Sequence, residues 1–181
     1  MEKNNFLIYI FGLAIIIVSI FLYTKKDALT PQKEVASFAE CVEAGYPVME
    51  SYPRQCRDSV GNSFTENIGN ALDKQNLIRV TNITPNQKIV SPLTITGEAR
   101  GYWYFEASFP VRLEDANGND VPLTPSYAMA QGEWMTEDFV PFSSTHTFSA
   151  PGTPTGTLIL QKDNPSGLPE NDDFLEIPVN F

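Results

Sequence analysis

Two hydrophobic patterns follow one another along the chain. The first is an unbroken apolar run over residues 6–23, from Phe6 to Tyr23, which contains no charged side chain. As a helix with a rise of about 1.5 Å per residue, this run would cover about 27 Å, and the hydrocarbon core of a bilayer is roughly 30 Å thick. We therefore predict that residues 1–24 form a short tail and a transmembrane helix, with the lipid bilayer as its partner.

A cleaved signal peptide is the alternative interpretation of this run. Signal cleavage requires small residues in an A-x-A arrangement, but the run ends with Leu22 and Tyr23, and Lys25 and Lys26 follow. The sequence therefore favours an anchor that stays in place. The flanking positive charges are neutral or slightly favour a cytoplasmic C-terminal side. A cysteine pair, an acidic soluble part and a short N-terminal tail outweigh them and favour a soluble part outside the cytoplasm.

The second pattern begins near residue 77 and alternates between apolar and polar positions, as in strands that bury one face. It is clearest over residues 105–114, where every second residue is apolar. These positions are Phe105, Ala107, Phe109, Val111 and Leu113. We predict one strand over this stretch, at a sheet edge or with a bulge at Pro110, because proline cannot donate a ladder hydrogen bond.

Turn signals and further strands complete this pattern. Asn117 and Gly118 predict a hairpin turn, because this pair tolerates positive φ at both central positions. The later strands are predicted over residues 127–130, 141–150, 156–162 and 174–181. About seven short strands in roughly 100 residues are typical of an immunoglobulin-like β-sandwich, so we predict a mainly β fold over residues 77–181.

A small module with two cysteines separates the two patterns. Residues 25–36 are a polar tether, residues 37–68 form the module and residues 69–76 are a polar linker. A segment this short cannot bury a stable core without a staple. A disulfide between Cys41 and Cys56 would close about 15 residues and contribute about 3 kcal/mol in the chain-entropy model.

The spacing of the two cysteines disfavours other roles for them. A structural zinc site needs four ligands, and the one histidine of the chain, His146, lies far along the sequence. A redox motif has the spacing C-x-x-C, which is not present here. The disulfide is therefore the favoured interpretation.

Part of the second pattern resembles a known family. Residues 91–101 read SPLTITGEARG, and an aromatic segment at residues 103–107 and a D-x-N-G turn at residues 115–118 follow. This order resembles the immunoglobulin-like domain of bacterial spore germination (Gmad type, second variety) over about residues 89–181. The resemblance implies an immunoglobulin-like fold, a bacterial surface or extracytoplasmic location and a binding role without catalytic residues.

The charge balance narrows the classes of partner. The chain has a formal net charge of −10, and 42% of its residues are hydrophobic, so it is acidic but rich enough in apolar residues to fold. No basic patch is visible, which disfavours nucleic-acid binding and contact with anionic lipid headgroups. The simplest role of the acidity is solubility.

Motifs for catalysis or for a cofactor are not found. His146 lies in the middle of a predicted strand and is interpreted as structural. Three carboxylates flank Trp134, and solvated loop charges explain them better than a sugar-processing site. These are Glu133, Glu137 and Asp138. The loop at residues 115–120 offers oxygen ligands but lacks the glutamate of a calcium-binding EF-hand. We predict no catalytic residue, no metal site and no cofactor.

Aromatic residues are the better indication of a binding site. Tyr102, Trp103 and Tyr104 are consecutive, so in an extended segment neighbouring side chains point in opposite directions and at least one is exposed. Trp134 lies in a loop-like stretch. We predict that these four residues contact a ligand. The alternative is that Trp103 is the core tryptophan of the sandwich.

Taken together, the sequence predicts a membrane-anchored, extracytoplasmic binding or scaffolding protein of the bacterial cell envelope that is not an enzyme. Its expected partner is a protein or a cell-wall glycan. The alternative function is an inhibitor or accessory factor of an envelope protease or cell-wall enzyme, which would act through the loop at residues 49–55.

Overall fold

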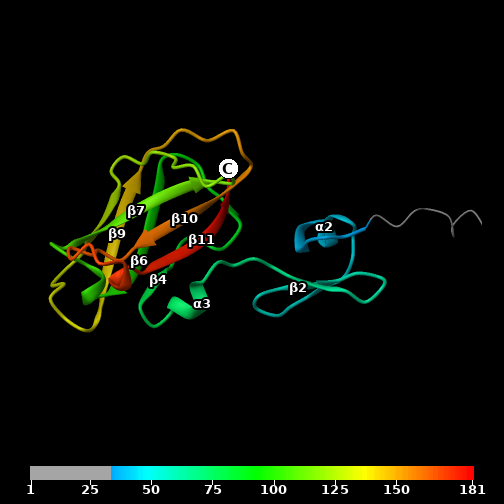
Figure 1. Ribbon diagram of the computed structural model, residues 1–181, viewed down its shortest axis with the longest axis horizontal. Coiled ribbons are helices and arrows are strands. Elements are labelled where there is room, and N and C mark those ends of the chain that lie inside the picture. The colour runs from blue at the N-terminus through cyan, green and yellow to red at the C-terminus, as the bar shows by residue number, and fades with distance from the viewer. Residues whose placement is uncertain (1–33) are drawn as a thin grey trace, which may run out of the picture.

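The structure is a computed structural model and describes residues 34–181 (Figure 1). The predicted transmembrane anchor and almost all of the tether lie outside these residues. Within residues 34–181, no helix has the length and apolar character needed to cross a bilayer. The described chain forms a small N-terminal module and a larger β domain (Figure 1).

The module packs one short helix on a three-stranded antiparallel sheet with the strand order β1-β2-β3. Its elements are α2 (Phe38–Glu43), β1 (Val48–Met49), β2 (Gln55–Arg57) and β3 (Ser63–Thr65). Ser37 caps the helix, because its hydroxyl accepts the backbone N–H of Glu40 at 3.2 Å. The Glu40 carboxylate accepts the backbone N–H of Ala36, so two backbone N–H groups at the start of the helix have side-chain acceptors.

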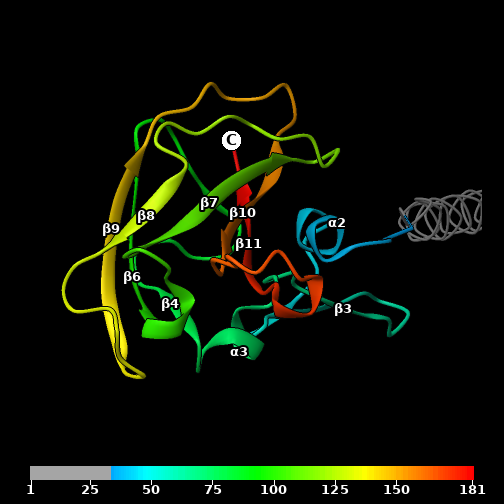
Figure 2. The same ribbon diagram turned by 60° about the vertical axis from the view of Figure 1, so that its left-hand side comes forward.

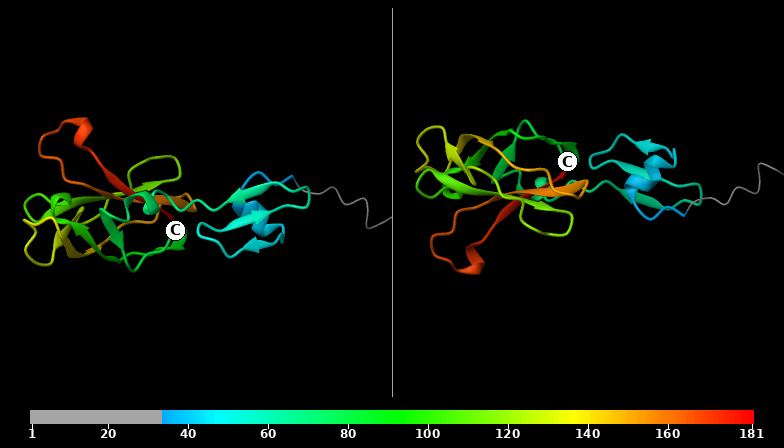
Figure 3. Two further views of the ribbon diagram at one scale, coloured as in Figure 1. Left: turned by 90° about the horizontal axis from the view of Figure 1, so that it is seen from below. Right: turned by 90° about the horizontal axis from the view of Figure 1, so that it is seen from above.

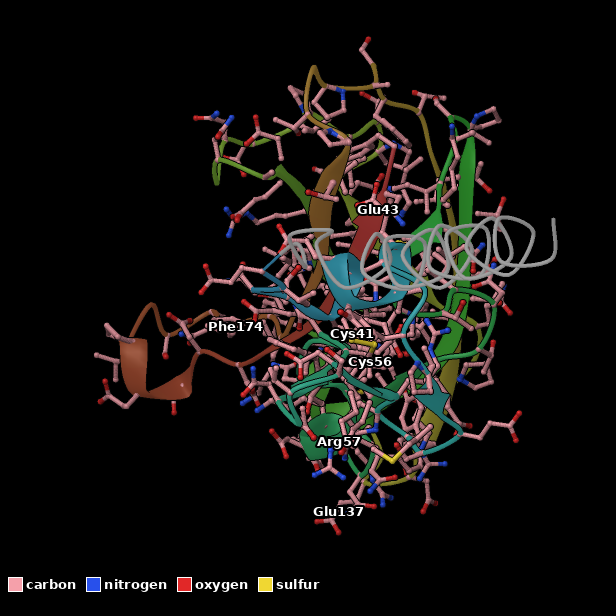
Figure 4. All side chains as sticks on the ribbon, turned by 90° about the vertical axis from the view of Figure 1, so that its right-hand side faces the viewer. Cys41, Glu43, Cys56, Arg57, Glu137 and Phe174 are labelled. Atoms are coloured by element: carbon pink, nitrogen blue, oxygen red, sulfur yellow. A yellow bond between two sulfur atoms is a disulfide. The ribbon has the colours of Figure 1, made fainter. Side chains whose placement is uncertain are left out.

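The predicted disulfide between Cys41 and Cys56 is confirmed. It joins α2 to β2, and Figure 4 shows the two residues side by side below the helix. Both cysteines are fully buried, and Val35 is the third buried residue of this core. Partly buried aromatic side chains pack around it, from Phe38, Tyr46 and Phe64.

The larger domain is one curled sheet of eight strands in the order β4-β6-β9-β8-β7-β10-β11-β5. The strands are β4 (Ile78–Val80), β5 (Gln87–Lys88), β6 (Leu93–Arg100), β7 (Ser108–Asp115), β8 (Tyr127–Ala130), β9 (Phe139–His146), β10 (Thr155–Gln161) and β11 (Phe174–Asn180). Two 3-10 turns, η1 (Gly101–Trp103) and η2 (Pro169–Asn171), lie between strands. All neighbouring strands are antiparallel except β5, which runs parallel to β11.

Strand β7 joins the two layers of the sandwich. Its first part, Ser108 to Pro110, pairs with β8, and the part from Val111 to Asp115 pairs with β10. Figure 2 shows β6 and β9 on one side and β10 and β11 on the other, with β7 running between them. Pro110 lies just before the β10 pairing begins, so its missing N–H costs no bond on that side.

The inward-facing residues of both layers form a single core. Phe109 of β7 lies at its centre, with its ring 5.1 Å from Phe142 and 5.2 Å from Tyr104, measured between ring centroids. The alternation predicted for the C-terminal strand is confirmed, because Leu175, Ile177 and Val179 are buried. The mainly β, immunoglobulin-like architecture is therefore as predicted, with eight strands instead of about seven.

One local prediction was wrong, and another holds with a different backbone. Strand β7 begins at Ser108 and not at Phe105, because Glu106 and Ala107 have positive φ (49° and 60°) and turn the chain. The apolar alternation of residues 105–107 therefore belongs to a turn, and Phe105 is 42% exposed. The predicted turn at Asn117 and Gly118 is present, because Glu114 and Asp120 pair across it, but only Gly118 of the two has positive φ (77°).

The loop after β7 is built around the side chain of Asp115. Its carboxylate accepts the backbone N–H of Asn117 at 2.8 Å and of Asn119 at 2.9 Å. The same contacts hold the pKa of Asp115 below its ordinary value. The Asp115 carboxylate, one of the oxygen groups that this loop offers, thus binds the loop's own backbone.

The predicted linker at residues 69–76 is docked on the domain. It contains the short helix α3 (Ala71–Lys74). The side chain of Asn70 donates to the carbonyl of Phe174 at 2.9 Å and accepts the N–H of Glu176 at 2.8 Å, both on β11. The linker is therefore part of the domain surface.

Candidate functional site

The consecutive aromatic residues after β6 divide between the core and the surface. Trp103 is fully buried and Tyr104 is 4% exposed, because η1 turns both inward. The Tyr104 hydroxyl donates to the carbonyl of Val140 at 2.7 Å, and burial raises the pKa of Tyr104. These two side chains pack the core and cannot contact a ligand in this conformation, which corresponds to the alternative interpretation of Trp103.

The other two predicted aromatics lie near one another. Tyr102 is half exposed, whereas Trp134 is partly buried and packs against the domain core. A Cβ atom at Gly101 would lie 2.3 Å from the carbonyl oxygen of Trp134, so the η1 turn and the Trp134 loop are in close contact. Met135 beside Trp134 is 74% exposed. Of the four predicted residues, Tyr102 is the one whose ring is open to a ligand.

The residues considered for catalysis have local structural partners. His146 is fully buried, and its ring nitrogens lie 2.6 Å from the carbonyl of Pro125 and 2.7 Å from the hydroxyl of Ser144. Burial lowers the pKa of His146. The Glu133 carboxylate accepts the N–H of Met135 at 3.0 Å. Within residues 34–181, no group of three or more potential metal ligands gathers.

A larger feature lies where the module meets the domain. A groove of about 830 Å³ runs between them. Phe38 and Val42 of α2, together with the whole of β3, line its module side. Asn86, Thr155 and Asn180 line its domain side, near the C-terminal end of β11, which lies beside the module (Figure 3).

Asn86 joins the two walls of this groove. Its side-chain amide donates to the carbonyl of Asn67 at 2.8 Å and to the carboxylate of Glu66 at 3.3 Å. Its backbone N–H donates to the carbonyl of Pro178 at 2.7 Å, and its carbonyl accepts the side-chain amide of Asn180. Asn86 adopts a positive φ of 62°, a conformation that asparagine tolerates better than most residues.

An ion pair on the module side supports this contact. Arg54 donates to both carboxylate oxygens of Glu66, at 2.8 and 2.5 Å. These hydrogen bonds are the main reason that the pKa of the Glu66 carboxyl lies below its ordinary value. Glu66 is only 8% exposed, and its hydrogen bonds with Arg54 favour the charged carboxylate although burial opposes it.

Gly69 holds the chain close to the domain just after this ion pair. Its φ is +69°, and a Cβ atom there would lie 1.9 Å from the carbonyl oxygen of Glu176. No side chain fits between the linker and β11 at this point. Gly69, Asn70 and Asn86 together fix how the module sits on the domain.

Comparison with known proteins identifies the domain. A family model described as the immunoglobulin-like domain of bacterial spore germination matches residues 77–167. The chain belongs to this family. No curated protein and no solved structure matches the chain significantly.

The match shows which part of the groove this germination-type domain supplies. Asn86 and Thr155 lie within the matched residues, whereas α2 and β3 precede them. The module therefore adds one wall to a domain of this family. The domain family is not a known class of enzyme, and the arrangement of apolar and polar groups in the groove suits binding.

Sequence reasoning did not find this groove. Its walls come from segments that are 20 to more than 90 residues apart, as the contacts of Asn86 with Glu66 and Asn180 illustrate. A positive φ at asparagine leaves only a weak local signal, because asparagine also occurs in ordinary turns. The missed residues are Glu66, Asn86 and Gly69.

Proposed function

We propose that this protein is a membrane-anchored binding protein of the bacterial cell envelope, which holds a partner outside the cytoplasm and performs no catalysis. The observation that carries the proposal is the groove of about 830 Å³, walled jointly by the module and the germination-type domain. Binding sites form preferentially at such junctions, where apolar walls meet a few fixed polar groups.

Three features support the envelope location. The apolar run over residues 6–23 has the length of a membrane span. The Cys41–Cys56 disulfide suits an oxidising compartment. The matched family is described from bacterial spore germination. The partner that this protein would hold is a protein or a cell-wall glycan.

The alternative, inhibition of an envelope enzyme through the loop at residues 49–55, has less support. Tyr52 of that loop lines a recess of about 220 Å³ against the domain, together with Ile78 and Ile83. An inhibitory loop must project away from its scaffold to enter an active site. Tyr52, in the middle of this loop, borders the domain instead.

The location is tested with a membrane-impermeant maleimide on intact cells that express the full chain. Cys41 and Cys56 are disulfide-bonded, so labelling is expected only after treatment with an impermeant phosphine reductant. A cytoplasmic protein with exposed thiols in the same cells serves as the control for leakage. Labelling of Cys41 and Cys56 only after lysis, without any reductant, would contradict the proposal.

A further inference from the structure

Strand β3 is an open edge of the module's sheet. In the part of the chain that the structure describes, the sheet ends there, because β3 pairs only with β2. Arg57 of β2 donates its N–H to the carbonyl of Pro47 on the β1 side, so the N–H of Arg57 points away from β3. Ser63 lies opposite Arg57 in an antiparallel pair whose hydrogen-bonding positions alternate, so the N–H and C=O groups of Ser63, and those of Thr65 two residues later, point away from β2. No backbone hydrogen bond within residues 34–181 uses these four groups.

This open edge lies in the groove. Ser63 and Thr65 line it, beside the apolar side chains of Phe38, Val42 and Phe64. Val42 is 41% exposed, so the apolar wall is accessible. A groove that pairs unused backbone groups with an adjacent apolar wall matches an extended peptide, which offers backbone groups along one edge and alternating side chains on its faces.

The charge of the module favours a basic occupant. Six carboxylates lie in residues 34–68, against only Arg54 and Arg57: Glu34, Glu40, Glu43, Glu50, Asp58 and Glu66. Arg54 is already paired with Glu66 at the groove. Complementary charge steers association and selects among partners, so a peptide with lysine or arginine side chains is favoured over an acidic one.

We propose that the groove binds an extended, basic segment of a partner protein, which adds to β3 as a fourth strand of the module's sheet. This inference rests on the proposed binding function and specifies its partner as a polypeptide. The domain wall, with Asn86, Thr155 and Asn180, limits the space beside the added strand. The site therefore depends on the docking of the module onto the domain.

The opposite edge of the same sheet offers a matched control. Val48 and Met49 of β1 are both exposed, and in this register the N–H of Val48 points away from β2. That edge does not border the groove. A peptide that merely seeks any free edge would use β1 as readily as β3.

The test is a selection from a phage-displayed library of linear peptides on the full chain in detergent micelles. The enriched peptides are then measured against three variants: Thr65→Pro, Thr65→Ala and Val48→Pro. Thr65→Pro removes the outward N–H without breaking the β2–β3 ladder, because that N–H does not take part in it. Thr65→Ala removes only the side chain, and Val48→Pro blocks only the opposite edge.

We expect basic peptides with alternating apolar residues whose affinity falls about tenfold or more in Thr65→Pro and is unchanged in the two controls. Amide exchange gives a second measurement that needs no variant, because bound peptide should protect the N–H groups of Ser63 and Thr65. A library that yields no such peptide, or peptides that protect neither amide, would overturn the inference. The location test by maleimide labelling is independent of this result, so the two proposals fail separately.

Discussion

The module and the germination-type domain bury apolar side chains to very different extents. Twenty buried residues form the domain core, and they come from both layers of the sheet. Among the described residues, the module's own core cluster contains only Val35 and the two cysteines. The domain is therefore held together by its packing, whereas the module depends on a covalent bond between helix and sheet and on its contact with the domain.

This difference explains how a small element can serve as one wall of a binding site. A segment of about 35 residues has too little core to hold a precise surface by itself. Docked through Asn86 and Gly69, it gains the rigidity of the larger domain. The module contributes an open strand edge, and the domain contributes the scaffold.

The largest effect is expected from the centre of the domain core. Phe109→Ala removes a fully buried ring that contacts Tyr104 and Phe142, so the free energy of unfolding should fall by about 3–5 kcal/mol. Urea unfolding followed by tryptophan fluorescence measures this, because both tryptophans lie in the domain. Tyr102→Ala, at the surface, should change the free energy of unfolding by less than about 0.5 kcal/mol. Similar losses for both variants would contradict the assigned core.

The next largest effect concerns the disulfide. Replacing Cys41 and Cys56 together by serine should destabilise the module by about 3 kcal/mol, because the closed loop spans 15 residues. Limited trypsin digestion should then cut at Arg54 and Arg57 much faster than in the native chain. The tryptophan-detected unfolding midpoint of the domain should not move. A module that resists trypsin without its disulfide would show that the staple is unnecessary.

A smaller effect is expected at the junction between the two regions. Gly69→Ala places a Cβ atom against the carbonyl oxygen of Glu176, so the linker must lift from β11. Amide exchange at Glu176, whose N–H donates to Asn70, should become about tenfold faster or more. Gly118→Ala is the matched control, since Gly118 also has positive φ but has no atom within 4 Å of the added Cβ. Equal exchange at Glu176 in both variants would argue against docking.

The smallest effect is a pH dependence that belongs to the domain alone. His146 is buried with a lowered pKa, so below its unfolded pKa of about 6.5 the unfolded chain binds more protons than the native one. The stability contributed by neutral His146 is thus present above about pH 6.5 and is lost as the pH falls. The urea concentration at the midpoint of unfolding should fall as the pH is lowered from 7.5 to 5, and it should fall less steeply in His146→Gln than in the native chain. Identical slopes would assign the pH dependence to other groups.

Sequence patterns were sufficient for the elements that depend on local order. The alternation in β7 and β11, the Asn117–Gly118 turn region and the cysteine pair each predicted a feature that the structure contains. The error arose where the apolar alternation continued although the backbone conformation changed from extended to a turn. Alternation at residues 105–107 resembled a strand, although positive φ at Glu106 and Ala107 makes it a turn.

The binding surface could not be predicted in the same way. Consecutive aromatics indicated that one ring would be exposed, but which ring depends on the η1 turn, and it is Tyr102. The groove depends on contacts between Asn86, Glu66 and Asn180, which no local pattern encodes. Such contacts follow from tertiary packing and become visible only in the folded chain.

Rigid docking of the module onto the domain is tested most directly by a distance measurement between them. Spin labels attached to non-cysteine keto amino acids at Val60 and Met135 leave the disulfide intact, and both positions are well exposed, at 76% and 74%. Double electron–electron resonance on the full chain in detergent micelles should give one narrow distance distribution, and Gly69→Ala should broaden it. A broad distribution in the native chain would show that the module moves freely, and the shared groove would then not exist as a binding site.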